Sequence, residues 1–202
     1  MLAAVGCGGK PPAPVPVAGS PPPQEPIKPF AVVPFAGQRV AVTPLTLVVA
    51  LDTLAEVAPF AARPAALAWA DSIVAAVLTA RGPEVNWVLP PELRKVARRA
   101  PTVAPDPDRM GQSIMRENAV ETIPDPLRSN LRSLMALVGG RFVFIPAVIT
   151  VLPEQSGMVR AEVSLVLADT RTGKVIWRTL TWGVGSTPSR ALGVAMEAVL
   201  PP

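Results

Sequence analysis

A proline-rich segment near the N-terminus limits what this chain can fold into. It runs from Lys10 to Pro29 and reads KPPAPVPVAGSPPPQEPIKP, so that nearly half of its residues are proline. Proline fixes φ and has no backbone N–H to donate, which excludes a helix or a central strand here. We expect an extended polyproline II arm that spans on the order of 60 Å at roughly 3.1 Å per residue. The sequence thus predicts a short N-terminal stretch at 1–9, an arm at 10–29 and a domain at 30–202.

The domain is expected to mix helices and strands. Runs of β-branched residues predict strands, and apolar residues at helical spacing predict helices. The strands are expected at 38–51, 84–90, 141–152, 158–169 and 174–183, and the helices at 64–82, 91–100, 125–140 and 188–200. Pro44 interrupts the first of these strands and implies an edge, a bulge or a strand end. We therefore predict a single α/β (α+β) domain. Its open mixed sheet has about four to five strands with helices packed on it, and a late β-hairpin and a C-terminal helix end the chain.

The clearest local signal is the hairpin LADTRTGKVIWRT, Leu167 to Thr179. Its four-residue loop ends at Gly173, where a positive φ is expected, and Asp169 can accept hydrogen bonds from the loop N–H groups. With Asp169 opposite Lys174, a regular hairpin places Leu167, Ile176, Leu180 and Trp182 on one face and Val166, Ala168, Val175 and Trp177 on the other. Apolar residues on both faces indicate an inner strand that is covered on both sides.

The order of these elements resembles a group of bacterial envelope domains. The lines GGRFVFIPAVITV and LADTRTGKVIW, followed by a helix near TPSRAL, are similar to the α/β domain of three kinds of protein: the curli-secretion lipoprotein, the lipoprotein activators of penicillin-binding proteins, and the N-terminal domain of the Tol–Pal translocation protein. The resemblance covers about residues 38 to 200. It implies an exported and often lipid-anchored domain without catalytic residues. The Pro- and Asp-rich segment 101–126 departs from it, and the long hairpins of a curli pore are missing.

Composition argues against several functional classes. The chain has no His and a single Cys, so Ser-His-Asp and Cys-His catalysis and His- or thiolate-based metal sites are excluded. Asp106 and Asp108 form a possible carboxylate pair, which we interpret as a solvated loop. The basic helix 91–100 lacks aromatic platforms or a groove-binding motif, which argues against nucleic acid. We therefore expect no enzyme, no cofactor and no metal. An enzyme that uses carboxylates is disfavoured but stays open.

The only cysteine lies in the stretch MLAAVGCGGK, in which small and apolar residues precede Cys7. This stretch resembles the lipobox of bacterial lipoproteins, in which the cysteine is lipidated and becomes the mature N-terminus. Ala4 stands where Leu is commoner, and the charged region and most of the apolar region of a signal peptide are absent. The alternative is a short apolar N-terminus with a buried or idle cysteine.

These features point to protein–protein contact at the bacterial envelope. We predict a periplasmic, membrane-anchored lipoprotein that scaffolds or regulates an envelope assembly. The alternative is an accessory subunit of a larger membrane complex (secretion, respiratory or photosynthetic) that docks through the arm. The arm is expected to be a tether, a segment without a role, or a partner-binding segment. Candidate interface residues are Trp87, Trp182, Arg94 and Arg98, and a homo-oligomer stays open.

If Cys7 lies in a lipobox, the mature protein starts at a lipid-modified Cys7. We expect the protein to fractionate with membranes and to incorporate labelled palmitate, and Cys7→Ala to abolish both. Mass spectrometry that finds an intact, unmodified Met1 in soluble cytoplasmic protein contradicts this interpretation.

Overall fold

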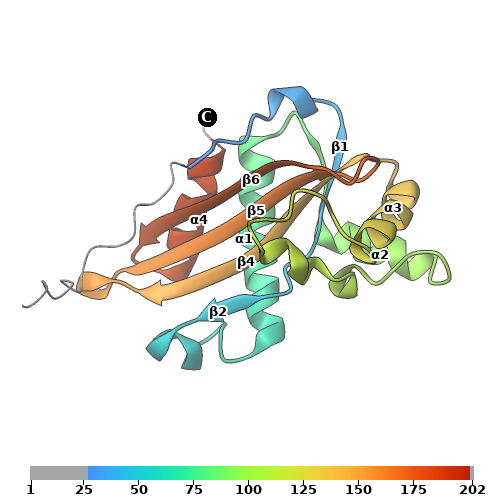
Figure 1. Ribbon diagram of the computed structural model, residues 1–202. Helices are drawn as coiled ribbons and strands as arrows, with labels where there is room; N and C mark the ends of the chain where they lie inside the picture. The colour runs from blue at the N-terminus through green and yellow to red at the C-terminus, as the bar shows by residue number, and fades with distance from the viewer. Residues whose placement is uncertain (1–26, 201–202) are drawn as a thin grey trace, which may run out of the picture.

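The computed structural model describes residues 27–200 as one sheet with helices on both faces (Figure 1). Cys7 and most of the predicted arm lie outside the described residues. The strands are β1 (Arg39–Val42), β2 (Val48–Ala50), β3 (Asn86–Val88), β4 (Phe142–Pro153), β5 (Val159–Asp169) and β6 (Val175–Gly185). The helices are α1 (Arg63–Arg81), α2 (Pro90–Arg99), α3 (Leu127–Val138) and α4 (Pro188–Val199), with five short 3-10 helices between them. Within residues 27–200 none of the helices combines the length and the apolar character that a membrane span needs.

The sheet is mixed, which confirms the predicted fold class. Its strands follow the order β3-β1-β4-β5-β6, and β2 pairs with β4 beside β1. The pairs β1/β3, β1/β4 and β2/β4 are parallel, whereas β4/β5 and β5/β6 are antiparallel. The sheet has six strands, one more than the upper end of the expected range.

The extra strand arises at Pro44, within the segment that the sequence predicts as one strand. β1 pairs with β4 at Phe142–Phe144, and β2 pairs with the same strand further along, at Ile149–Val151. Between them Pro44 has no N–H to donate, and the N–H of Leu45 turns away to donate to Asp71 Oδ1 at 2.9 Å. The proline therefore marks the end of one strand, one of the alternatives that the sequence leaves open.

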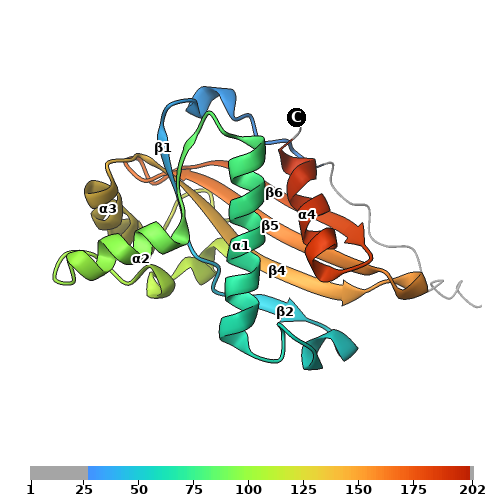
Figure 2. The same ribbon diagram turned by 180° about the vertical axis from the view of Figure 1, so that it is seen from behind.

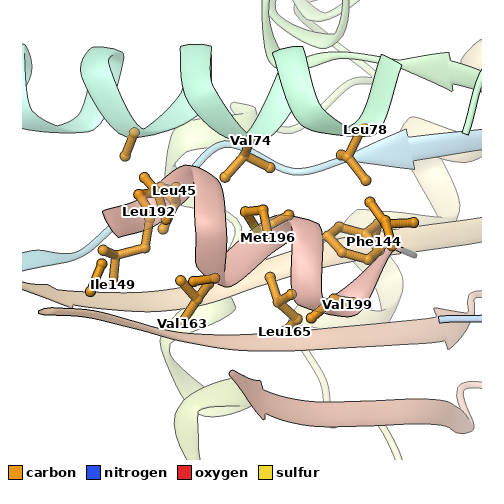
Figure 3. Packing of buried hydrophobic residues seen from close by; sticks show 14 of the residues in the cluster. Leu45, Val74, Leu78, Phe144, Ile149, Val163, Leu165, Leu192, Met196 and Val199 are labelled. Atoms are coloured by element: carbon orange, nitrogen blue, oxygen red, sulfur yellow. The ribbon is translucent and has the colours of Figure 1, made fainter. Parts of the chain in front are cut away.

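Each face of the sheet holds a separate core. The first lies between the sheet and the helices α1 and α4 and is built from Leu45, Val74, Leu78, Phe144, Ile149, Val163, Leu165, Leu192, Met196 and Val199 among others (Figure 3). α1 contributes Ala70, Val74 and Leu78, an i, i+4 series on one side of the helix. The second core lies under α2 and α3 and includes Leu93, Leu131, Leu134, Val143 and Ile145. The two cores cover unequal lengths of the sheet: from β5 the first contains residues between Val159 and Leu167, whereas the second contains only Val166 and Ala168. Figures 1 and 2 show α2 and α3 at the end of the sheet that carries the hairpin turn.

Two glycines of β6 let α4 pack directly on the strand. A Cβ atom at Gly183 would collide with the backbone of Ala191 and Ala195, and one at Gly185 would lie 2.7 Å from the Ala191 nitrogen. The Thr181 hydroxyl on the same side donates to the Ala195 carbonyl at 2.9 Å. These contacts fix which side of β6 is buried under α4.

The register of the hairpin differs from the prediction because of a β-bulge. Ala168 lies opposite Val175 as expected, but Leu167 lies opposite Trp177, so that Ile176 is the extra residue. A one-residue shift exchanges the two faces of a strand. Trp177 therefore packs in the first core, and the expected placement of Leu180 and Trp182 on the same face as Leu167 is wrong. Both point to the opposite face.

The hairpin loop is held by Asp169. Its Oδ1 accepts from the N–H groups of Arg171 and Thr172 at 2.9 and 3.4 Å, and its Oδ2 accepts from Arg141 at 2.6 Å. The Arg141 guanidinium and these N–H groups hold the pKa of Asp169 well below its usual range. Gly173 ends the loop with a φ of +81°, and a Cβ atom there would lie 2.8 Å from Arg128 Nε.

Gly173→Val should therefore lower the free energy of unfolding by more than about 1 kcal/mol, because the substitution combines a positive φ with a steric clash. Arg171→Ala at the exposed tip of the same loop should stay within about 0.5 kcal/mol of the wild type. Chemical denaturation of the two variants measures both values, and equal midpoints would contradict this description of the turn.

Candidate interaction face of the sheet

One part of the sheet is left without a covering layer. α2, α3 and the segment between them cover the side of β4–β6 that faces the viewer in Figure 1, but only at the end near the hairpin turn. At the other end the same side of β2, β4, β5 and β6 points to solvent. We call this region the open face and define it by Val49, Val148, Thr150, Leu152, Arg160, Glu162, Leu180, Trp182 and Val184.

Strand register brings the residues of the open face together. Side chains alternate along a strand, and the neighbours of these residues, such as Ile149, Val151 and Val163, are buried in the first core. The pairing of the strands aligns the outward residues into rows across the sheet. The central row runs Val49, Thr150, Glu162, Trp182, and the rows beside it contain Val148 with Leu180 and Leu152 with Arg160 and Val184.

The open face is apolar for a surface that contacts water. Leu180 is 57% exposed and Trp182 is 37% exposed. Val148, Leu152 and Val184 are half-buried, and neither core cluster includes any of the five. Exposed apolar residues that occur singly are ordinary, whereas a contiguous group marks a surface for interaction.

Arg160 orients the tryptophan of this face. Its guanidinium lies 4.6 Å from the centre of the Trp182 ring and forms an ion pair with Glu162 at 2.9 Å. A cation over an indole face stabilises by about 0.5–1 kcal/mol where the pair is exposed. Arg160 Nε is buried, and no group of the described chain accepts from it. Trp182 is thus held as a flat platform with a positive charge above it.

Two further arginines form the boundary between the covered end and the open face. Arg178 donates to the carbonyls of Met115 and Val120 at 2.8 and 3.2 Å, and so holds the segment 115–120 on the sheet. Arg116 in that segment donates to the Ala147 carbonyl at 3.2 Å and to Thr46 Oγ1 at 3.1 Å. Burial lowers the pKa of both guanidinium groups. Among residues 27–200 neither forms an ion pair with a carboxylate, so the boundary carries positive charge.

The four residues predicted for an interface do not form one surface, and only Arg94 and Arg98 are neighbours, on α2. Trp182 is on the open face, whereas Trp87 is half-buried in the first core, where its Nε1 donates to the Gly82 carbonyl at 2.8 Å. Arg94 on α2 forms ion pairs with Asp71 at 3.1 Å and with Asp108 at 2.8 Å. Arg98 is exposed on the same helix. Of this set, only Trp182 joins a contiguous apolar surface.

The charged cluster around Arg94 ties parts of the fold together. It links α1 through Asp71, α2 through Arg94 and the loop 101–111 through Asp108. Burial raises the pKa of Asp71 although Leu45 and Arg94 donate to it. A hollow of about 370 Å³ lies beside the cluster, between Arg94, Arg98, Asp106 and Asp108. Arg94 and Asp108, which line this hollow, are hydrogen-bonded to each other, from Arg94 Nε to Asp108 Oδ2 at 2.9 Å and from Arg94 Nη2 to Asp108 Oδ1 at 2.8 Å.

The sequence analysis did not predict most of the open face. Apolar residues on both sides of the hairpin predict two covered faces, and this is wrong for β6, which is an edge strand with Leu180 and Trp182 exposed. The signal that could have located the face is the mixture of Thr, Arg and Glu with Val and Leu at alternate positions in 148–152 and 160–162. Fully buried strands do not contain such residues.

Comparisons with known proteins find solved structures that are similar to this chain at low sequence identity. No family model matches the chain, and no curated protein matches it. The similar solved structures include the LpoB C-terminal domain from Salmonella enterica, with 14% identity over 75% of this chain and 84% of that one and a TM-score of 0.42. They also include the PelC dodecamer from Paraburkholderia phytofirmans, with 18% identity over 88% and 93% of the two chains and a TM-score of 0.42. The lipoprotein GNA1162 from Neisseria meningitidis has 16% identity over 74% and 81% and a TM-score of 0.37.

A leucine-to-alanine substitution on each face of the sheet tests which face contributes to the free energy of unfolding. Leu165→Ala in the first core should lower the free energy of unfolding by about 2–5 kcal/mol, since it leaves a cavity. Leu180→Ala on the open face should change it by less than about 1 kcal/mol. Urea denaturation gives both values, and a similar loss in the two variants would mean that the open face is covered.

Proposed function

We propose that this chain is a non-enzymatic lipoprotein of the bacterial envelope, which scaffolds or regulates an assembly by binding another protein through the open face. The observation that carries the proposal is the contiguous apolar surface of Leu180, Trp182 and their neighbours on the sheet. Interfaces are enriched in Trp and Arg, and a few such residues supply most of the binding energy. Trp182 with Arg160 above it has this character.

The location is inferred from the N-terminal sequence. A lipid on Cys7 would hold the chain at a membrane, and an arm of on the order of 60 Å would let the domain reach a partner away from the bilayer surface. A single acyl chain binds a membrane only weakly, so stable anchoring needs the several chains of a lipoprotein or a second contact. We therefore place the domain in the periplasm.

A binding role also agrees with the residues available for chemistry. The chain lacks His and Tyr, and the acidic residues nearest to a hollow, Asp106 and Asp108, each lie within 4 Å of an arginine, at 3.9 and 2.8 Å. General acid–base catalysis needs a titratable group that is free to exchange a proton with substrate.

A second candidate function rests on the arm itself. An extended proline-rich segment binds partners at low entropic cost, so the chain could be an accessory subunit of a larger membrane complex that docks through the arm. The two functions differ in one experiment. Replacing the arm by a Gly/Ser linker of matched reach preserves partner recovery if the open face binds the partner, and abolishes it if the arm does.

The main test is affinity capture from membranes in mild detergent. The double variant Leu180→Ala/Trp182→Ala should recover the partner at least about tenfold less than the wild type, because hot-spot residues carry 2 kcal/mol or more. Val33→Ala and Val103→Ala are matched controls, since both valines are exposed, at 78% and 62%, and lie outside the open face. Undiminished recovery by the double variant, with the fold intact, would overturn the proposal.

A further inference from the structure

Two arginines from opposite sides of the sheet meet at Thr46, just before β2. Arg63, the first residue of α1, donates from Nη2 to the Thr46 carbonyl at 3.0 Å. Arg116, in the segment between α2 and α3, donates from Nη2 to Thr46 Oγ1 at 3.1 Å. Its Nε donates to the Ala147 carbonyl of β4 at 3.2 Å. We call Arg63, Arg116 and Thr46 the arginine corner.

The arginine corner has no counter-charge among the side chains that the structure describes. Neither guanidinium forms an ion pair there with a carboxylate, and their acceptors are two carbonyls and a hydroxyl, which are neutral. Glu117, which follows Arg116 in the chain, is exposed and is not paired with it. Burial and the positive charge of Arg63 lower the pKa of Arg116. Two like charges held close together cost free energy unless an anion lies beside them.

Several N–H groups of the corner stay free for an incoming anion. A guanidinium carries five N–H groups in a planar fork, and within the described residues Arg63 uses one of them and Arg116 uses two. This fork binds a carboxylate through two parallel hydrogen bonds. Arg63 is exposed and Arg116 is half-buried. The corner is therefore open to a ligand and is partly shielded from water, which strengthens a charge-assisted hydrogen bond.

We propose that the arginine corner binds a carboxylate of the partner protein, so that the open face recognises a segment that carries Asp or Glu beside its apolar residues. This inference rests on the proposed function and adds the chemistry of the partner. Complementary charge across an interface selects among partners and speeds their association. The corner would supply this selectivity, whereas the apolar residues of the open face supply contact area.

The arginine corner continues the open face. Arg116 is hydrogen-bonded to Ala147, which directly precedes Val148 of that face. Val49, in the strand that follows Thr46, begins the row that crosses four strands and ends at Trp182. Neighbouring strands lie roughly 4.8 Å apart, so the ends of this row are about 15 Å apart. A partner that uses both places has to hold its acidic group on the order of 15 Å from the residue that covers Trp182.

An acidic protein fits this distribution of charge better than an anionic membrane surface does. Arg160, the arginine beside Trp182, already forms an ion pair with Glu162 at 2.9 Å. The unpaired positive charge is therefore concentrated at the corner and not spread over the face. Anionic bilayers attract clusters of many Lys and Arg residues, whereas two converging guanidinium groups match one or two carboxylates.

A nuclear magnetic resonance titration of the full chain with Cys7→Ser tests the inference with a defined probe, a hexaglutamate peptide blocked at both ends. The peptide should shift the Arg63 and Arg116 Nε–H signals saturably, with a Kd below about 1 mM at low salt. Arg63→Gln/Arg116→Gln should weaken this binding at least about tenfold, because both charged donors are lost. Arg98→Gln/Arg99→Gln is the matched control. It removes the same charge from exposed arginines of α2 and should change the Kd less than about threefold.

The unfolding midpoint of each variant reports whether the fold is kept. If the double variant at the corner unfolds, Arg63→Gln alone keeps the test decisive, since this residue is exposed, and it should weaken binding about threefold or more. Equal weakening in the two double variants would overturn the inference, and so would corner signals that the peptide does not shift.

Binding to phosphatidylglycerol vesicles in place of the peptide, lost in Arg63→Gln/Arg116→Gln, would also overturn the inference, since it would identify a membrane as the occupant. Failure of the proposed function is distinguishable. It appears as undiminished partner capture by the Leu180→Ala/Trp182→Ala variant, which keeps both arginines of the corner and leaves peptide binding there unchanged.

Discussion

The architecture depends on three long antiparallel strands that are longer than the helices on one of their sides. β4 has 12 residues and β5 and β6 have 11 each, so they span on the order of 35–40 Å. On one side, α1 with 19 residues and α4 with 12 residues pack on a core that contains residues of β5 from Val159 to Leu167. On the other side, α2 and α3 with 10 and 12 residues extend only about 15 and 18 Å. The open face is the part of the sheet that these short helices do not reach.

One bulge and two glycines decide which side chains of β6 are exposed where α2 and α3 do not cover the sheet. The extra residue Ile176 turns Trp177 into the first core and turns Leu180 and Trp182 outward. Gly183 and Gly185 then let α4 lie on the inner side of the same strand. Trp182 therefore lies on the side of β6 that has no helix, whereas Trp177 lies on the side of α4.

Local signals in the sequence predict the class of the fold, the positions of the helices and the turn at Gly173, because these depend on periodicity and on backbone preferences of single residues. The division of the first strand was open at Pro44, since a proline is compatible with an edge, a bulge or a strand end. The bulge at Ile176 has no marker such as glycine, and it follows from packing Trp177 against Phe30 and Phe144. The open face was missed for the same reason: which side of β6 is covered depends on contacts distant in sequence.

The arm connects these features to the proposed role. Its first described residues contact β6 on the side of α4, where the Lys28 N–H donates to Thr179 Oγ1, whereas Trp182 points to the opposite side of the same strand. The end of the arm and the proposed binding surface therefore lie on the two sides of one strand.

Site-specific photo-crosslinking in cells tests most directly whether the open face binds another envelope protein. A benzoylphenylalanine placed at Leu180 is expected to yield a discrete crosslinked species with a second envelope protein, whereas the same probe at Val103, which is also exposed, should yield none. A discrete species from position 103 with none from position 180, at equal expression and membrane localisation, would contradict the account.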